Sequence, residues 1–123
     1  MVNIFIVDDD QSLQRLYTLI LREAGFKIID TALNGKIAVE KYKKFKESPD
    51  LVLMDHRMPI KNGIEAMVEI LQINCKEKII FASADITIKE KALSLGAYAF
   101  LDKPFNISKL VSAIQNIVQE IAV

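Results

Sequence analysis

The chain has 123 residues, 51% of them hydrophobic, and its 16 Lys and Arg residues balance its 16 Asp and Glu residues. This length and apolar content are typical of one folded domain over residues 1–123 and exclude a disordered chain. The balanced charge offers no basic surface for nucleic acid, and the apolar runs are too short to cross a membrane. The start of the chain lacks the basic stretch of a signal peptide, and the single cysteine, Cys75, fits a reducing compartment, so we expect a cytoplasmic protein.

Five short apolar runs alternate with five helical patterns along the chain. Strands are predicted at residues 3–7, 27–32, 51–54, 78–82 and 99–101, and helices at residues 13–24, 34–45, 64–73, 86–95 and 107–121. Four of the runs are almost continuously apolar, which is typical of strands covered on both faces. Short strand–helix repeats favour a parallel sheet, and the chain is too short for an eight-stranded barrel. The sequence therefore predicts an α/β fold with an open, doubly wound, five-stranded parallel sheet and five helices.

Polar side chains follow four of the five predicted strands. They are Asp8, Asp9, Asp10, Asp55, Ser83, Asp102 and Lys103. In open α/β sheets, ligands bind beyond the carboxyl ends of the strands, so we expect these groups to converge on one shallow cleft. The strand at 27–32 has no charged group at this end, which fits a place at the edge of the sheet.

The acidic part of this cleft needs a counter-charge. Two carboxylates about 5 Å apart repel each other by roughly 3 kcal/mol at an effective dielectric constant near 20. Several carboxylates together suit Mg²⁺, which often shares its ligands with a phosphate group. The hydroxyl of Ser83 and the ammonium of Lys103 suit phosphate oxygens. Asp55 then has the surroundings of a carboxylate nucleophile that forms an acyl phosphate.

Four motifs, each at the end of a predicted strand, carry a resemblance to a known family. In chain order they read "IFIVDDD", "LVLMDHRMP" followed by "NG", "IIFASAD" and "GAYAFLDKPF". The chain resembles the receiver domain of two-component response regulators over essentially its whole length. The resemblance implies the CheY-like, flavodoxin-like strand order 2-1-3-4-5, which agrees with the edge position inferred for residues 27–32.

The resemblance also implies roles for the acidic residues. Asp55 corresponds to the phosphoacceptor, and Asp8 and Asp9 correspond to the acidic pair that holds Mg²⁺ (or Mn²⁺). Arg57, two residues after Asp55, corresponds to the position whose backbone carbonyl binds the metal. His56, between them, is expected to be an exposed loop residue.

Further roles follow from the later motifs. Ser83 and Lys103 correspond to the residues that hold the phosphoryl oxygens, and the bond from Lys103 to Pro104 corresponds to the family's cis peptide. Phe100 corresponds to an aromatic residue that changes its rotamer on activation. Formation of the acyl phosphate is expected to draw Ser83 inward, and Phe100 is expected to follow.

The function implied is that of a stand-alone receiver, a signalling switch that assists its own phosphorylation and dephosphorylation but is not an enzyme acting on a substrate. Its phosphoryl donor would be a histidine kinase or a histidine phosphotransfer protein. The surface formed by residues 86–95, 98–102 and 106–121 would change its affinity for an unknown protein target. The same surface could join two copies into a weak dimer, or the protein could be a monomer.

Two other functions fit parts of the sequence. The "DDD" run also matches the D-x-D start of haloacid-dehalogenase-type phosphohydrolases, with Asp8 as nucleophile and Asp10 as acid and base. A phosphohydrolase function would leave Asp55 unexplained, and the chain lacks a substrate-covering insertion. The other possibility is a scaffold that has the receiver fold but is not phosphorylated. In the receiver reading, Asp10 instead belongs to the start of the first helix.

Overall fold

The computed structural model describes residues 2–103 and 106–122 and contains a five-stranded parallel sheet in the order β2-β1-β3-β4-β5. The strands are β1 (Asn3–Val7), β2 (Lys27–Ala32), β3 (Leu51–Met54), β4 (Ile79–Ser83) and β5 (Ala99–Asp102). The helices are α1 (Gln11–Glu23), α2 (Gly35–Lys44), α3 (Gly63–Ile73), α4 (Lys89–Ser94) and α5 (Ile107–Ala122), with a short 3₁₀ helix η1 (Ile86–Ile88) before α4. The predicted fold class and strand order are confirmed.

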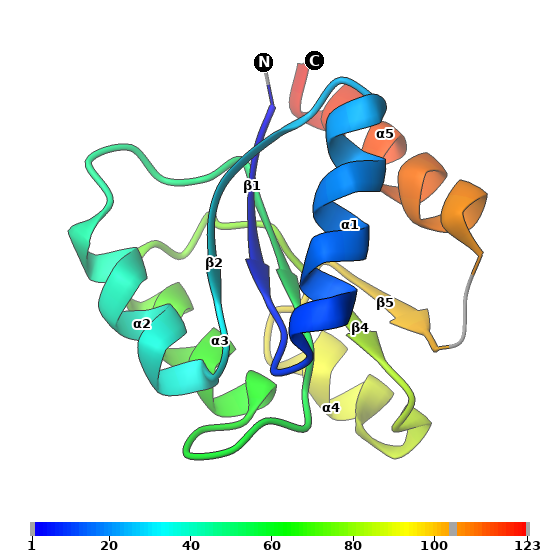
Figure 1. Ribbon diagram of the computed structural model, residues 1–123. Helices are drawn as coiled ribbons and strands as arrows, with labels where there is room; N and C mark the ends of the chain where they lie inside the picture. The colour runs from blue at the N-terminus through cyan, green and yellow to red at the C-terminus, as the bar shows by residue number, and fades with distance from the viewer. Residues whose placement is uncertain (1, 104–105, 123) are drawn as a thin grey trace.

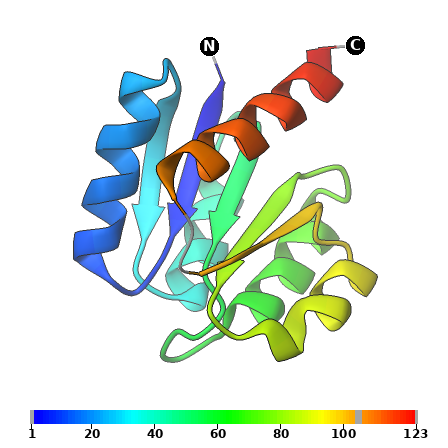
Figure 2. The same cartoon turned by 90° about the vertical axis from the view of Figure 1, so that its right-hand side faces the viewer.

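Helices cover both faces of the sheet, with α1 and α5 on one side and α2, α3 and α4 on the other (Figures 1 and 2). Alternate residues of β1 enter the two layers: Phe5 and Val7 pack toward α2 and α3, and Ile4 and Ile6 pack toward α1 and α5. All four side chains are buried, which explains why the strand reads as a continuous apolar run. In the described part of the chain, no helix is long and apolar enough to cross a membrane.

Polar side chains start three of the helices at the carboxyl edge of the sheet. The Asp10 carboxylate accepts hydrogen bonds from the backbone N–H groups of Ser12 and Leu13 and so caps α1. Asn34 caps α2 in the same way, and Asn62 caps α3. These caps fix where each helix begins, and therefore where each loop after a strand must end.

The predicted helix at 86–95 is instead divided into η1 and α4. The Asp85 side chain accepts a hydrogen bond from the Thr87 N–H and caps a single 3₁₀ turn, and α4 begins only at Lys89. Ile86, within that turn, is 62% exposed. The polar cap at Asp85 holds the segment in a tight turn before the α-helical bonding pattern starts.

Two glycines hold the loop between β3 and α3 close to its neighbours. A Cβ atom on Gly35 would clash with the carbonyl oxygen of Lys61, and one on Gly63 would clash with the carbonyl oxygen of Asp55. Gly35 N–H donates to Lys61 O at 3.0 Å, and Gly63 N–H donates to His56 O at 2.9 Å. The loop is therefore hydrogen-bonded to the start of α2 and closed on itself directly after Asp55.

Within this loop, Ile60 has a left-handed backbone, with φ of +71°, and its side chain is 76% exposed. A β-branched residue is disfavoured there, because its Cβ crowds the following carbonyl at a cost of roughly 1–2 kcal/mol. We expect Ile60→Asn to raise the free energy of unfolding by about 1 kcal/mol, because Asn tolerates this conformation. Urea unfolding measures the change. Ile86→Asn, at an exposed isoleucine without positive φ, is the matched control and should give no such gain; an equal gain in both would contradict the strain at Ile60.

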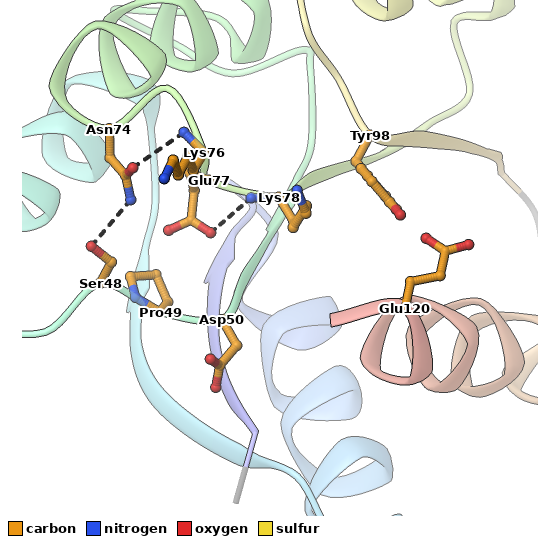
Figure 3. Close-up of a pocket in the computed structure, with 9 residues that line it drawn as sticks. All are labelled: Ser48, Pro49, Asp50, Asn74, Lys76, Glu77, Lys78, Tyr98 and Glu120. Atoms are coloured by element: carbon orange, nitrogen blue, oxygen red, sulfur yellow. Dashed lines mark hydrogen bonds between the residues drawn. The ribbon is translucent and has the colours of Figure 1, made fainter. Parts of the chain in front are cut away.

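A buried acid lies at the amino edge of the sheet, opposite the edge at which the helices begin. Glu77, just before β4, is 6% exposed and accepts hydrogen bonds from the Tyr42 hydroxyl at 2.7 Å and the Lys78 N–H at 2.9 Å. The Asn74 amide donates to the Tyr42 hydroxyl and to Ser48 (Figure 3 shows the second of these bonds). Burial raises the pKa of Glu77 to about 7. Cys75, beside Asn74, is exposed.

A cavity of about 500 Å³ adjoins this group. It is lined by Ser48, Pro49, Asp50, Asn74, Lys76, Glu77, Lys78, Tyr98 and Glu120 (Figure 3). The Lys78 ammonium lies over the Tyr98 ring, 5.0 Å from its centre, rather than against the Glu77 carboxylate. Among the described ion pairs none includes Glu77, so its charge is balanced only by hydrogen bonds and by more distant groups.

Candidate functional site

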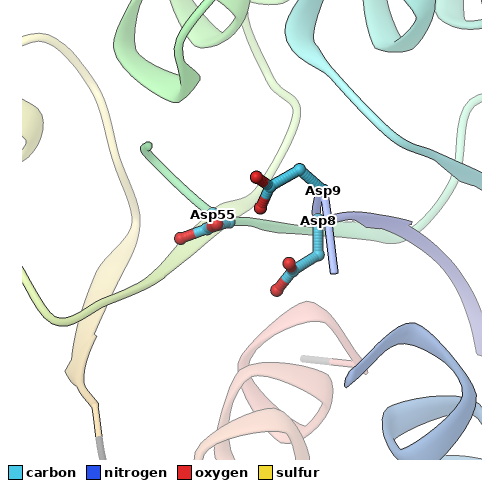
Figure 4. Close-up of side chains that lie close together, drawn as sticks. All are labelled: Asp8, Asp9 and Asp55. Atoms are coloured by element: carbon cyan, nitrogen blue, oxygen red, sulfur yellow. The ribbon is translucent and has the colours of Figure 1, made fainter. Parts of the chain in front are cut away.

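Three carboxylates converge at the carboxyl edge of the sheet. Asp8 and Asp9 follow β1, and Asp55 follows β3, the strand beside it. Each contributes an oxygen atom, and these oxygens all lie within 4.8 Å of one another (Figure 4). The register of the two strands brings them together, because Val7 pairs with Met54 and the Asp55 N–H donates to Val7 O at 2.9 Å.

Lys103 supplies positive charge to this cluster from the end of β5. Its ammonium nitrogen lies 3.3 Å from Asp8 Oδ2 and 3.6 Å from Asp55 Oδ1. The Lys103 N–H also donates to Ser83 O at 2.9 Å, which fixes its backbone against β4. Burial opposes the charge on Lys103, but the neighbouring carboxylates of Asp55 and Asp8 together raise its pKa, so the side chain is an ammonium ion at neutral pH.

The pKa values of the acids reflect the crowding. Burial raises the pKa of Asp55 to about 6; Lys103 lowers it, while the negative charges of Asp8 and Asp9 raise it further. Burial also raises the pKa of Asp8, which is 2% exposed, despite its hydrogen bond from the Asp10 N–H at 2.9 Å. Among the described ion pairs, Lys103 is the one cation that reaches the cluster, through Asp8 and Asp55, so the three carboxylates carry an excess of negative charge.

A hard divalent cation fits this donor set. Carboxylate oxygens are the ligands that Mg²⁺ and Mn²⁺ prefer, and the cluster offers three of them within reach of one ion. The Asp55 carboxylate is oriented by the His56 N–H, which donates to Asp55 Oδ1 at 2.9 Å. The residues Asp8, Asp9 and Asp55 therefore form an Mg²⁺ site.

We expect Mg²⁺ to stabilise the folded protein. A cation that binds only the native state at 100 times its Kd adds about 2.7 kcal/mol to the free energy of unfolding, and here it also relieves the repulsion among the acids. Thermal unfolding with and without Mg²⁺ measures the effect. Asp9→Asn should lose most of it, whereas Asp102→Asn, which removes an exposed acid outside the cluster, should retain it. Equal responses in the two variants would contradict the site.

The third acid of the "DDD" run has a different position. The Asp10 carboxylate is engaged with the first turn of α1, and the three-carboxylate cluster does not include it. The phosphohydrolase alternative required Asp10 to face the reacting group together with Asp8. The structure gives Asp10 the helix-cap role instead.

A cavity of about 340 Å³ lies beside Asp55 on the side of β4 and β5. It is lined by Asp55, Arg57, Ser83, Ala84, Asp85 and Lys103. Ser83 is the last residue of β4 and is buried; its Oγ accepts a hydrogen bond from the Asp85 N–H at 3.1 Å. The exposed Arg57 guanidinium donates to the Asp85 carboxylate at 3.3 Å. The walls of the cavity therefore carry acid, hydroxyl and ammonium groups and the ion pair of Arg57 with Asp85.

Aromatic rings continue from this cavity into the protein. Phe100 of β5 is half-buried and stacks on Phe81 of β4, with 6.4 Å between the ring centres and 12° between the planes. His56 is a loop residue, as expected, but it is half-buried rather than exposed. Its Nδ1 accepts a hydrogen bond from Ile64 N–H at 3.4 Å, and burial lowers its pKa. Pro104 and its predicted cis peptide lie outside the described residues.

The sequence patterns did not predict the role of one buried residue near the site. Gln14 of α1 packs with its amide between the ends of β1 and β2. It lies three residues before Tyr17 and seven before Leu21, both buried, so a polar residue on the buried face of α1 was the available signal.

The chain matches the model of the response regulator receiver domain over residues 4–115. It is 40% identical over 116 residues to the chemotaxis protein CheY of Thermotoga maritima, covering 93% of this chain and 95% of that protein. It is 42% identical over 113 residues to CheY of Bacillus subtilis, covering 90% and 92% of the two chains.

Solved structures of response regulators are also similar to this chain. One chain of the CheX–CheY–BeF₃–Mg²⁺ complex of Borrelia burgdorferi is 32% identical with a TM-score of 0.86, covering 99% of this chain and 90% of that one. The response regulator TrrA of Thermotoga maritima, in complex with Mg²⁺ and beryllium fluoride, is 32% identical with a TM-score of 0.85, covering 95% and 99%. The chain therefore belongs to the response regulator receiver domain family and is a signalling switch rather than a catalytic enzyme.

Proposed function

We propose that this protein is switched by a phosphoryl group that Asp55 accepts from a histidine kinase or a histidine phosphotransfer protein. One observation carries the proposal: Asp55 shares an acidic cluster with Asp8 and Asp9, lies 3.6 Å from the Lys103 ammonium, and lines a cavity that Ser83 also lines. A bound Mg²⁺ supplies positive charge that neutralises the acids and the incoming phosphoryl oxygens.

The reaction moves one phosphoryl group between two nucleophiles. The P–N bond of the donor phosphohistidine breaks, a bond forms between phosphorus and a carboxylate oxygen of Asp55, and the donor imidazole leaves with the electron pair. Asp55 must be ionised for this attack, and its pKa of about 6 leaves it ionised at pH 7 and above. Lys103 and the Ser83 hydroxyl hold oxygens of the transferred group.

The remaining residue roles extend the same proposal. The backbone carbonyl of Arg57 is a further metal ligand. The cis peptide before Pro104 stays a prediction. The extent of a single receiver domain over residues 1–123 also stays a prediction. The two similar structures with Mg²⁺ and beryllium fluoride support cation binding in this position.

The output is a change of shape at the surface of α4, β5 and α5. When Ser83 moves toward the phosphoryl group, Phe100 can follow into the space beside β4, because its ring is only half-buried and lies against Phe81. The exposed Leu93, Leu95 and Tyr98 on this surface offer apolar contacts to a target protein or a second copy of the chain. Phosphorylation then acts by a population shift between two packings.

The partners follow from this chemistry. A donor protein must present a phosphohistidine, and we place the exchange in the cytoplasm. The similar Borrelia structure is a complex of CheX and CheY, which supports a protein as a partner of this chain.

Phosphotransfer from purified kinases tests the proposal. Each phosphorylated histidine kinase of the source organism is mixed with the protein and Mg²⁺, and loss of label from the kinase is followed over seconds. We expect rapid transfer from one kinase, directly or through a phosphotransfer protein, to a bond that hydroxylamine cleaves, as it cleaves acyl phosphates. No labelling by any kinase, relay protein or small acyl-phosphate donor would favour the unphosphorylated scaffold instead.

A further inference from the structure

Gln14 forms a buried clamp at the exits of two strands. It is 8% exposed, and its Nε2 donates two hydrogen bonds of 2.7 Å, one to Asp8 O and one to Ala32 O. Asp8 directly follows β1, and Ala32 is the last residue of β2. The amide nitrogen has two hydrogens, so both are used, and α1 is tied to the ends of both strands through one side chain.

The carbonyl oxygen held on the β1 side belongs to the peptide between Asp8 and Asp9. That peptide is planar, so fixing its oxygen also fixes the direction in which both flanking Cα atoms lie. The backbone of Asp8 is held a second time, because its N–H donates to Ala32 O at 3.0 Å. Gln14 therefore acts on the one peptide that joins two of the three clustered carboxylates.

The Asp8 side chain is held as firmly as its backbone. Its Oδ1 accepts from the Asp10 N–H at 2.9 Å and its Oδ2 faces the Lys103 ammonium. These contacts aim the carboxylate correctly only while the Asp8 backbone keeps its place. An apolar side chain in place of Gln14 would donate no hydrogen bond to the carbonyls at the two strand exits. The peptide between Asp8 and Asp9 would then be free to rotate, or water would enter to bond its oxygen.

We infer that Gln14 is a positioning residue for the cation site, which sets the separation of the Asp8 and Asp9 carboxylates without touching the ion. The inference rests on the proposed function only in that these two acids bind a cation; it does not depend on the phosphoryl donor. Residues behind a metal's ligands commonly change its affinity by 10–100-fold when they are replaced.

The test compares Gln14→Met with a matched variant on the same helix. Met fills a similar volume but donates no hydrogen bond. Thr18→Val removes the bond that Thr18 Oγ1 donates to Gln14 O at 2.7 Å, so it weakens α1 without altering the amide clamp. Binding of Mn²⁺ to the full chain is titrated by the electron paramagnetic resonance signal of the free ion, and stability is measured by urea unfolding.

We expect Gln14→Met to weaken Mn²⁺ binding by about 10-fold or more, and Thr18→Val to change it less than about 2-fold even where both lower the unfolding midpoint. Gln14→Asn, with the same amide one methylene shorter, replaces the Met variant if that does not fold, and should weaken binding too. Unchanged affinity in the Gln14 variants, or an equal loss in Thr18→Val, would overturn the inference. Failure of the unaltered protein to bind Mn²⁺ would overturn the cation site as well. Intact Mn²⁺ binding without phosphotransfer would count only against the proposed function.

Discussion

The Asp55→Asn variant should form no acyl phosphate, whereas Asp10→Asn should be phosphorylated as fast as the unaltered protein. Asn at position 55 has the size of Asp, but its amide is a poor nucleophile and carries no charge for the transfer. Asn at position 10 is as good a helix cap as Asp, so α1 should keep its first turn. The pair thus separates the acid that reacts from the acid that only caps.

A small acyl-phosphate donor with Mg²⁺ provides the measurement, because it needs no cognate kinase. Labelled protein is quantified by mass spectrometry, which gives a gain of one phosphoryl group on intact protein and locates it after proteolysis. Label that persists in Asp55→Asn, or that is lost in Asp10→Asn, would return the acceptor role to the "DDD" run and revive the phosphohydrolase hypothesis.

The second large effect concerns the buried acid at the amino edge. Glu77 has a pKa of about 7 in the folded protein, against an ordinary value of 4.5. The folded state therefore holds this proton more tightly than the unfolded state, so the free energy of unfolding falls as pH rises from about 4.5 to about 7 and is then constant. At roughly 1.4 kcal/mol for each pKa unit, the loss is about 3 kcal/mol.

Glu77→Gln should remove this loss, because Gln stays neutral at every pH. We expect the stability of Glu77→Gln relative to the unaltered protein to increase by about 3 kcal/mol between pH 4 and pH 8, measured by urea unfolding at a series of pH values. Asp55 and Asp8 also have raised pKa values, but their contributions are present in both proteins and cancel in the difference.

Tyr42→Phe is the matched control at this edge. It removes the hydroxyl that donates to Glu77 but leaves the carboxyl in place, so the fall in stability with pH should remain. The fall should extend to higher pH, because the lost hydrogen bond favoured the ionised form and its removal raises the pKa of Glu77 in the folded protein. Parallel pH profiles for Glu77→Gln and the unaltered protein would show that Glu77 titrates normally.

The sheet and the acidic cluster could be predicted because both follow from short-range patterns. Strands covered on two faces read as apolar runs, and parallel strands bring their carboxyl ends to one edge, so Asp8 and Asp55 meet wherever the strand order is right. The roles of Gln14 and His56 could not be predicted in this way. Each is decided by a backbone group outside its own local pattern, the carbonyl of Ala32, 18 residues from Gln14, and the N–H of Ile64, 8 residues from His56.

The loop between β3 and α3 shows a second limit. Nothing in its sequence requires Ile60 to adopt positive φ; the requirement comes from closing the loop around Gly63 while the Lys61 carbonyl accepts a bond from Gly35. The same holds for the division of the predicted helix at 86–95, which depends on one side-chain cap from Asp85.

The position of Cys75 makes the molecule convenient to observe. It is the only cysteine in the sequence, it is exposed, and it lies between α3 and β4, at the end of the sheet away from Asp55. A fluorophore attached to this thiol needs no engineered residue and leaves the cation site uncovered. Because its neighbour Asn74 is hydrogen-bonded to Tyr42, the same dye would report local opening around Glu77 and, through its tumbling rate, the arrival of a partner protein at the other end.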